Sequence, residues 1–261
     1  MIDRVAFTLA GVPVYWYGIL MALAIALAVL TCMARERRLG LTHDTTLNLS
    51  LWVVPMGLIG ARLYYVLFSL GDYIKNPLLI FDLRSGGLAI YGAVIAGVLT
   101  GIVYARVTRQ PFWALADLVA PTIALGQAIG RWGNFVNQEA YGYAVADPAL
   151  MWFPMSVFIE ATGQWHLATF FYESVWCLLL CVALLIAERR RAFKRRGDLF
   201  LWYVMLYALE RGLVEGLRTD SLMLGGLRVS QVLSMAACVI CAIVLWMRRN
   251  TKDPENDGRP V

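Results

Sequence analysis

Seven long apolar stretches are the feature that most restricts how this chain can fold. A helix needs about 20 mostly apolar residues to cross the hydrocarbon core of a bilayer. Hydrophobic residues make up 60% of the 261 positions, and they are concentrated in these stretches rather than spread evenly. The pattern predicts an all-α polytopic membrane protein with seven transmembrane helices. The stretches are Tyr15–Met33, Leu47–Leu70, Leu88–Ala105, Ala114–Trp132, Ala168–Ala187, Leu199–Gly216 and Val229–Met247.

Clusters of basic residues in alternate connections predict the orientation of the chain. Cytoplasmic loops carry an excess of Lys and Arg, so we expect all four clusters in the cytoplasm. Seven spans then place the N-terminus outside and the C-terminus in the cytoplasm. Because the net charge of +5 has this topological explanation, we expect no nucleic-acid partner. The clusters are Arg35, Arg37 and Arg38; Arg106 and Arg109; Arg189, Arg190, Arg191, Lys194, Arg195 and Arg196; and Arg248, Arg249 and Lys252.

We expect one domain over residues 1–261, with no linker or internal repeat. The longest connection is a small extracytoplasmic head segment, Asn134–Leu167, and its stretch Met151–Trp165 predicts a hairpin. The polar end of the chain, Asn250–Val261, has the composition of a disordered tail. Two further connections are longer than simple turns and also face outward in this topology: Met1–Val14 and Gly71–Gly87.

Arginines enter the predicted spans near their outer ends. Inserting one arginine centrally costs about 2.5–3.5 kcal/mol, so three unpaired arginines would cost roughly 8–10 kcal/mol. That approaches the stability of a whole domain, so ion pairs or a polar cavity must offset it. A guanidinium binds phosphate through a bidentate fork. Arg62, Arg131, Arg211 and Arg218 therefore predict a site for a phospholipid headgroup at the outer leaflet.

A polar cluster follows Arg131 where the fourth span ends. Asn134, Asn137 and Glu139 supply two carboxamides and a carboxylate, which together offer hydrogen bonding next to an anion site. Ionisable residues at membrane depth are a functional-site hypothesis by default. Gly130 and Gly133 flank the arginine, and they suit either close helix packing or irregular backbone beside a ligand.

Two interpretations remain open for the sixth span. Arg211, Glu215 and Arg218 are spaced i, i+4 and i+7, which puts them on one helix face. They form either an internal ladder of salt bridges or part of a set of guanidiniums that converge on phosphate. Tyr17 and Tyr91 each begin a predicted span, where a tyrosine either packs as an interfacial anchor or donates a hydrogen bond. We interpret the five cysteines as packing residues and find no ligand set for a metal.

The segment Gly130-Arg131-Trp132-Gly133-Asn134-Phe135, with Asn137, Glu139 and Gly142, resembles the hallmark of bacterial phosphatidylglycerol–prolipoprotein diacylglyceryl transferases. The resemblance runs from the first predicted span to the last. It includes Tyr17-Gly18, Gly60-Ala61-Arg62, Gly86-Gly87-Leu88-Ala89-Ile90-Tyr91-Gly92, Thr169-Phe170-Phe171-Tyr172-Glu173, Arg211 with Glu215, and Ser230-Gln231.

The resemblance implies a seven-span enzyme of the bacterial inner membrane. It implies transfer of the diacylglyceryl group of phosphatidylglycerol to the cysteine thiol of a lipobox in a prolipoprotein signal peptide. That reaction forms a thioether, releases glycerol phosphate and begins lipoprotein maturation. The expected partners are these two substrates and the lipid bilayer, with no cofactor and no metal. The residues important in the family match Tyr17, Arg131, Asn134, Glu139, Gly142, Arg211 and Glu215.

We assign roles to these residues as hypotheses. Arg131 and Arg211 would hold the phosphate and stabilise the leaving group, and Glu139 would take the thiol proton with Tyr17 or Tyr91 as a hydrogen-bonding partner. The other headgroup-binding residues would be Asn134, Asn137, Gly142, Glu215, Arg62 and Arg218.

This sequence departs from the family at two positions. Tyr91-Gly92-Ala93 stands where many members have His-Gly-Gly, so the identity of the base stays open. His166-Leu167-Ala168 replaces a common His-Pro, which leaves the role of His166 open as well.

Two other classes of function compete with an enzyme. An anion transporter also has intramembrane arginines, but it needs polar residues through its full depth, and Ala22–Leu30 and Val175–Leu185 contain no charged residue. A scaffold without chemistry would leave the clustered Asn134, Asn137 and Glu139 unexplained. The sequence therefore favours a transferase.

Overall fold

The computed structural model describes residues 3–74, 76–82, 86–193, 195–219 and 223–249, and every structural statement below refers to them. The predicted tail Asn250–Val261, together with Lys194 and Lys252 of the basic clusters, lies outside the described residues. The chain divides into two compact units, Met1–Leu30 with Val119–Val261, and Thr31–Leu118. Each unit is described by itself.

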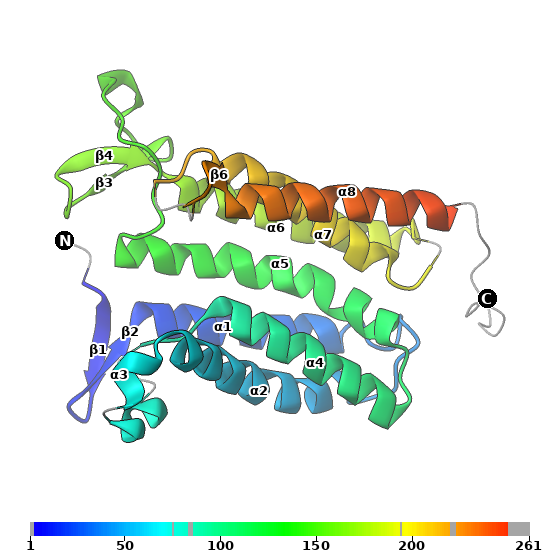
Figure 1. Cartoon of the computed structure of the whole chain (residues 1–261). Helices are drawn as coiled ribbons and strands as arrows, with labels where there is room; N and C mark the ends of the chain where they lie inside the picture. The colour runs from blue at the N-terminus through cyan, green and yellow to red at the C-terminus, as the bar shows by residue number, and fades with distance from the viewer. Residues whose placement is uncertain (1–2, 75, 83–85, 194, 220–222, 250–261) are drawn as a thin grey trace. The chain divides into compact units, whose positions relative to one another are not determined.

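Each predicted apolar stretch coincides with an observed helix (Figure 1). Among the described residues, six helices are long and apolar enough to cross a membrane, which makes this a polytopic membrane protein. α7 (Asp198–Glu215) is not among the six, and it carries four charged residues, Asp198, Glu210, Arg211 and Glu215. The six are α1 (Trp16–Met33), α2 (Thr45–Phe68), α4 (Ile90–Thr108), α5 (Phe112–Asn137), α6 (Thr169–Arg189) and α8 (Val229–Arg249).

Large apolar side chains on these helices remain exposed at the surface of the protein. Leu51 and Trp52 on α2 and Ile240 and Trp246 on α8 are examples. Soluble monomers rarely expose extended apolar faces. A helix satisfies its own backbone hydrogen bonds and can therefore present such a face to lipid. The exposed faces agree with a lipid environment.

The core of the first unit lies between α5, α6 and α7. Its buried members are Ala120, Ala124, Leu180, Cys181, Leu184, Leu199 and Tyr203. Alanine on α5 allows close helix approach. The Ser174 hydroxyl donates to the carbonyl of Ala128 (2.8 Å) and accepts from the Trp132 indole (3.1 Å), which ties the start of α6 to the end of α5. These contacts hold α6 against the end of α5, which carries Arg131, Asn134 and Asn137.

In the second unit, α2 packs along α4. A Cβ on Gly60 would lie 2.7 Å from the carbonyl oxygen of Gly92, so the two helices approach at their backbones. The turn after α1 is closed by Glu36, whose buried carboxylate accepts from the amides of Thr46 (2.9 Å) and Asp44 (3.1 Å). The two amides thereby satisfy this buried carboxylate.

Three two-stranded sheets make the all-α prediction incomplete. The predicted hairpin in the head segment is confirmed, with Ser156 opposite Leu167, Ile159 opposite Gln164 and a left-handed Gly163 (φ 66°) in the turn. The other two sheets were not expected from the sequence. The strands are β1 (Val5–Leu9) with β2 (Val12–Tyr15), β3 (Ser156–Ile159) with β4 (Gln164–Leu167), and β5 (Met223–Leu224) with β6 (Leu227–Arg228). The short helices are α3 (Leu70–Ile74), η1 (Pro77–Phe81) and η2 (Pro148–Leu150).

Candidate active site

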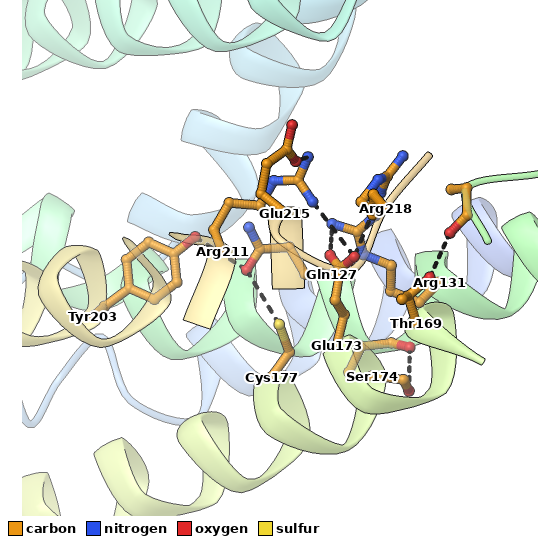
Figure 2. A network of polar contacts seen from close by, with 12 residues as sticks. Gln127, Arg131, Thr169, Glu173, Ser174, Cys177, Tyr203, Arg211, Glu215 and Arg218 are labelled. Carbon is orange, nitrogen blue, oxygen red and sulfur yellow. Dashed lines mark hydrogen bonds and ion pairs between the residues drawn. The ribbon is translucent and has the colours of Figure 1, made fainter. Parts of the chain in front are cut away.

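A single buried carboxylate, that of Glu173 in the second turn of α6, collects three arginines from the first unit (Figure 2). One carboxylate oxygen forms an ion pair with Arg131 of α5. The other lies 3.5 Å from Arg211 of α7 and 3.4 Å from Arg218, which follows that helix. Three of the four predicted guanidiniums thus lie together around Glu173, and their binding of a phosphate stays a prediction.

The sixth predicted span contributes a ladder contact as well. Arg211 pairs with Glu215 one turn later at 2.6 Å, while it also reaches Glu173. The ladder of salt bridges is therefore present in this structure, whereas convergence on a phosphate stays a prediction. We call these five groups the arginine–glutamate cluster: Arg131, Arg211, Arg218, Glu173 and Glu215. Three guanidiniums and two carboxylates give the cluster a net charge of +1. Such an excess in a largely buried site favours binding of an anion.

The α5 helix ends in a loop that positions the predicted polar residues. Asn134 lies one turn beyond Arg131 on the same helix face. The Asn137 amide donates to the exposed Glu139 carboxylate at 3.2 Å. Gln138 (φ 53°) and Ala140 (φ 58°) on either side of Glu139 are both left-handed. Non-glycine residues in that region are strained, and such strain gathers at functional sites.

Gly142 lies where three chain segments meet. Its amide donates to the carbonyl of Leu167 (3.0 Å), and it forms a β-bridge with Arg218. A Cβ here would lie 2.8 Å from the Leu167 Cβ and 2.9 Å from the carbonyl oxygen of Leu217. The structure places Gly142 behind the cluster, where its missing side chain permits the packing that holds Arg218.

His166 is buried beneath that junction. Its Nδ1 lies 2.8 Å from the carbonyl oxygen of Gly142, so this nitrogen must donate. Its Nε2 lies 2.9 Å from the Thr162 hydroxyl. Both ring nitrogens are therefore occupied by the head segment, which gives His166 a structural position.

Tyr17, in the first turn of α1, packs its ring against Gly133 of α5. A Cβ on Gly133 would overlap this ring, whereas one on Gly130 would find only the Met21 sulfur, at 3.8 Å. Tyr17 also interacts electrostatically with Glu139 and Arg131. Gly133 thus leaves room for the Tyr17 ring next to Asn134, Asn137 and Glu139.

Arg228 is a site residue that sequence reasoning missed. Its guanidinium donates to the carbonyls of Glu215 and Arg218 and, at 2.5 Å, to the Tyr143 hydroxyl. It therefore fixes the chain after α7, where the cluster residues lie. The signal available in the sequence was a basic residue at the outer end of a span, where positive charge is disfavoured.

Two predicted site residues, Arg62 and Tyr91, belong to the second unit. The Arg62 guanidinium directs all five N–H groups to main-chain carbonyls. These contacts favour a structural role for Arg62 over the predicted role in headgroup binding. Tyr91, in the first turn of α4, is exposed, and its ring lies 6.3 Å from that of Tyr64. The five carbonyl oxygens that accept from Arg62 belong to Leu79, Ile80, Asp82, Gly86 and Gly87 and lie 2.5–3.0 Å from its nitrogens.

Comparison with known proteins identifies the family. A model of the prolipoprotein diacylglyceryl transferase family matches residues 4–247. The chain belongs to this family. A phosphatidylglycerol–prolipoprotein diacylglyceryl transferase of Bacillus cytotoxicus is 46% identical over 254 residues, which cover 96% of this chain and 93% of that protein. Enzymes of the same name from Bacillus cereus and Bacillus thuringiensis subsp. konkukian are 45% identical over 252 residues, or 95% of this chain and 93% of each relative. The family match spans α5, α6 and α7, which carry the arginine–glutamate cluster.

Proposed function

We propose that this protein transfers the diacylglyceryl group of phosphatidylglycerol to the cysteine thiol of a prolipoprotein lipobox. The gathering of Arg131, Arg211 and Arg218 around Glu173 carries this proposal, because guanidiniums held together in this way are the groups that bind a phosphate. Family membership supplies the choice of phospholipid and peptide as substrates.

The charge balance of the cluster suits the reaction. A phosphodiester carries one negative charge, whereas the phosphate monoester that leaves carries about 1.5–2 at neutral pH. A site with one positive charge in excess binds the developing charge more strongly than the substrate's charge, which is the condition for acceleration. Preformed ion pairs to Glu173 also fix the guanidiniums before the lipid arrives, so little reorganisation accompanies catalysis.

The transfer step exchanges one bond to carbon for another. The thiolate sulfur attacks the glyceryl carbon bonded to phosphate oxygen, a C–S bond forms, and the C–O bond breaks with its electron pair going to that oxygen. The thiol proton must first reach a base, because the thiolate is the nucleophile. We assign this role to Glu139, with Tyr17 as hydrogen-bonding partner. Glu173, which pairs with three guanidiniums, is better suited to holding them than to accepting a proton.

The remaining residues position the substrates. Asn134 and Asn137 would orient the headgroup, Glu215 would align Arg211, and Gly142 would hold Arg218 in place. We propose that α7 is the seventh span and that residues 1–261 form a single transferase domain. Basic connections then lie in the cytoplasm of a bacterium, and the cluster faces the outer leaflet of its plasma membrane.

A transfer assay tests this assignment with the purified full-length protein, labelled phosphatidylglycerol and a lipobox peptide. Removing one donor from a transition-state anion site typically costs about 10²–10³ in rate, so Arg131→Ala and Arg211→Ala should each lose at least that much. Arg190→Ala, at the exposed far end of α6, should behave like the parent protein. Near-normal lipidation by either cluster variant would refute the phosphate role. Anion flux into proteoliposomes without lipidation would instead support a transporter.

A further inference from the structure

A hollow lies at the end of α6, α7 and α8 that is away from Glu173. It has a volume of about 950 Å³ and is lined by residues from the end of α6, the start of α7 and the end of α8. Along α6, its lining begins at Leu180, about 10 Å from Glu173, and ends at Ala187, about 20 Å from it, at a rise of 1.5 Å per residue. Ligand sites commonly enclose about 300–1,000 Å³. The hollow is therefore large enough to hold part of a lipid, and it is separate from the arginine–glutamate cluster.

The lining of this hollow combines apolar, aromatic and charged side chains. Leu180, Leu184, Leu206 and Leu245 form an apolar wall. Two tryptophans, Trp202 and Trp246, also line it and are exposed, as is typical of side chains at the level of lipid headgroups. The charged side chains of the lining are three arginines and one carboxylate, which leaves an excess of positive charge. They are Arg195, Arg248, Arg249 and Asp198.

Asp198 offsets only one of these three positive charges. Its carboxylate lies 3.4 Å from Arg248, whose guanidinium also donates to the carbonyl of Arg196 at 3.2 Å. Arg248 is thereby fixed at the rim, and Arg249 next to it is exposed. Basic pockets between membrane helices on the cytoplasmic side recognise the headgroups of anionic lipids. A signal peptide is a poor occupant, because its own n-region is positively charged.

We propose that this hollow binds an anionic glycerophospholipid of the cytoplasmic leaflet, in a site that takes no part in transfer. The phosphodiester lies against Arg248 and Arg249, and an acyl chain lies along the leucine wall. The choice of leaflet rests on the orientation proposed above. The lipid would join the ends of α6, α7 and α8 and so support the helices whose opposite ends carry the arginine–glutamate cluster.

Native mass spectrometry of the full-length protein in detergent tests this site without any turnover, so its result is independent of the transfer assay. The probes are phosphatidylserine and phosphatidylcholine with the same acyl chains. The protein should retain phosphatidylserine in preference to phosphatidylcholine. The double variant Arg248→Gln with Arg249→Gln should bind phosphatidylserine at least about tenfold more weakly, because each basic residue adds to the attraction for anionic lipid.

Two matched controls separate the site from general surface charge and from loss of structure. Arg189→Gln with Arg190→Gln removes two exposed arginines at the same end that do not line the hollow, and it should leave binding unchanged. Ala187→Trp fills the hollow and should weaken both lipids, whereas Val182→Trp, exposed elsewhere on α6, should not. If the Arg248 variant unfolds, Arg249→Gln and Ala187→Trp decide the question. Equal binding of the two lipids, or equal loss in both arginine pairs, would overturn the proposal.

Discussion

Replacing Glu173 by Gln tests the centre of the arginine–glutamate cluster. The substitution keeps the size of the side chain and removes one negative charge from a residue with no exposed surface. Arg131, Arg211 and Arg218 then lose their shared partner at once, and the net charge of the cluster rises from +1 to +2. We expect the three guanidiniums to repel one another and to lose their fixed geometry.

The expected loss of stability follows from the burial of the partners. Removing one member of a buried ion pair costs about 3–5 kcal/mol. The arginine side chains retain 10–20% exposure, and glutamine keeps one acceptor oxygen, so the lower value of about 3 kcal/mol applies. For a protein of this size that is a decrease of about 6–12 °C in Tm. Misplacement of the guanidiniums should also reduce transfer at least about 100-fold.

Two measurements on the same detergent-purified sample check both effects, namely Tm and the rate of peptide lipidation. Ser174→Ala is the matched control, since Ser174 is the next residue on α6, is buried, and contributes hydrogen bonds without charge. It should lose about 1–2 kcal/mol, because it gives up two hydrogen bonds that are each worth about 1 kcal/mol, and keep most of its activity. The reasoning fails if Glu173→Gln matches this control in both Tm and rate.

Three further substitutions examine single contacts. Gly133→Ala should strongly reduce lipidation, because its methyl group overlaps the ring of Tyr17, whereas Gly130→Ala should be tolerated in the same assay. Gly142→Ala places a methyl group 2.8–3.0 Å from three atoms and should cost about 1–3 kcal/mol, seen as a lower Tm. Burial tends to raise the pKa of the Glu36 carboxyl, but hydrogen bonds from two main-chain amides outweigh this and hold the pKa below its usual value. Its stabilisation is therefore complete above a pH of about 4.3 and is lost as the pH falls through the lowered pKa, so Glu36→Gln should make acid unfolding less steep.

The helices were predictable because the length of an apolar run is a local property. α7 shows why pattern is more informative than hydropathy alone, since Glu210, Arg211 and Glu215 lower its apolarity without preventing a helix. The position of Arg131 at the end of a span was local information too. Arg131 does lie with two other arginines at Glu173, and its binding of phosphate stays a prediction.

The role of Glu173 could not be read from spacing. Two of its three partners, Arg211 and Arg218, lie 38 and 45 residues further along the chain, so only the packing of α6 against α7 brings them to Glu173. The first hairpin was hidden for a different reason. Its turn uses Ala10 with φ 49° before Gly11, where a sequence signal would have needed Asn or Asp. Pro13 within the second strand further weakens the pattern of a strand.

The five hydrogen bonds of Arg62 have a consequence for the shape of residues 79–82 and 86–87 in the second unit. The main-chain oxygens of Leu79, Ile80, Asp82, Gly86 and Gly87 can all reach one flat cation only when residues 79–82 and 86–87 both lie against Arg62 on α2. A shift of the segment by one residue would forfeit several of these bonds together, rather than one at a time. The arginine thus acts as a template that admits a single register for a stretch in which the described residues form no sheet, and Lys in its place would offer too few donors to do so.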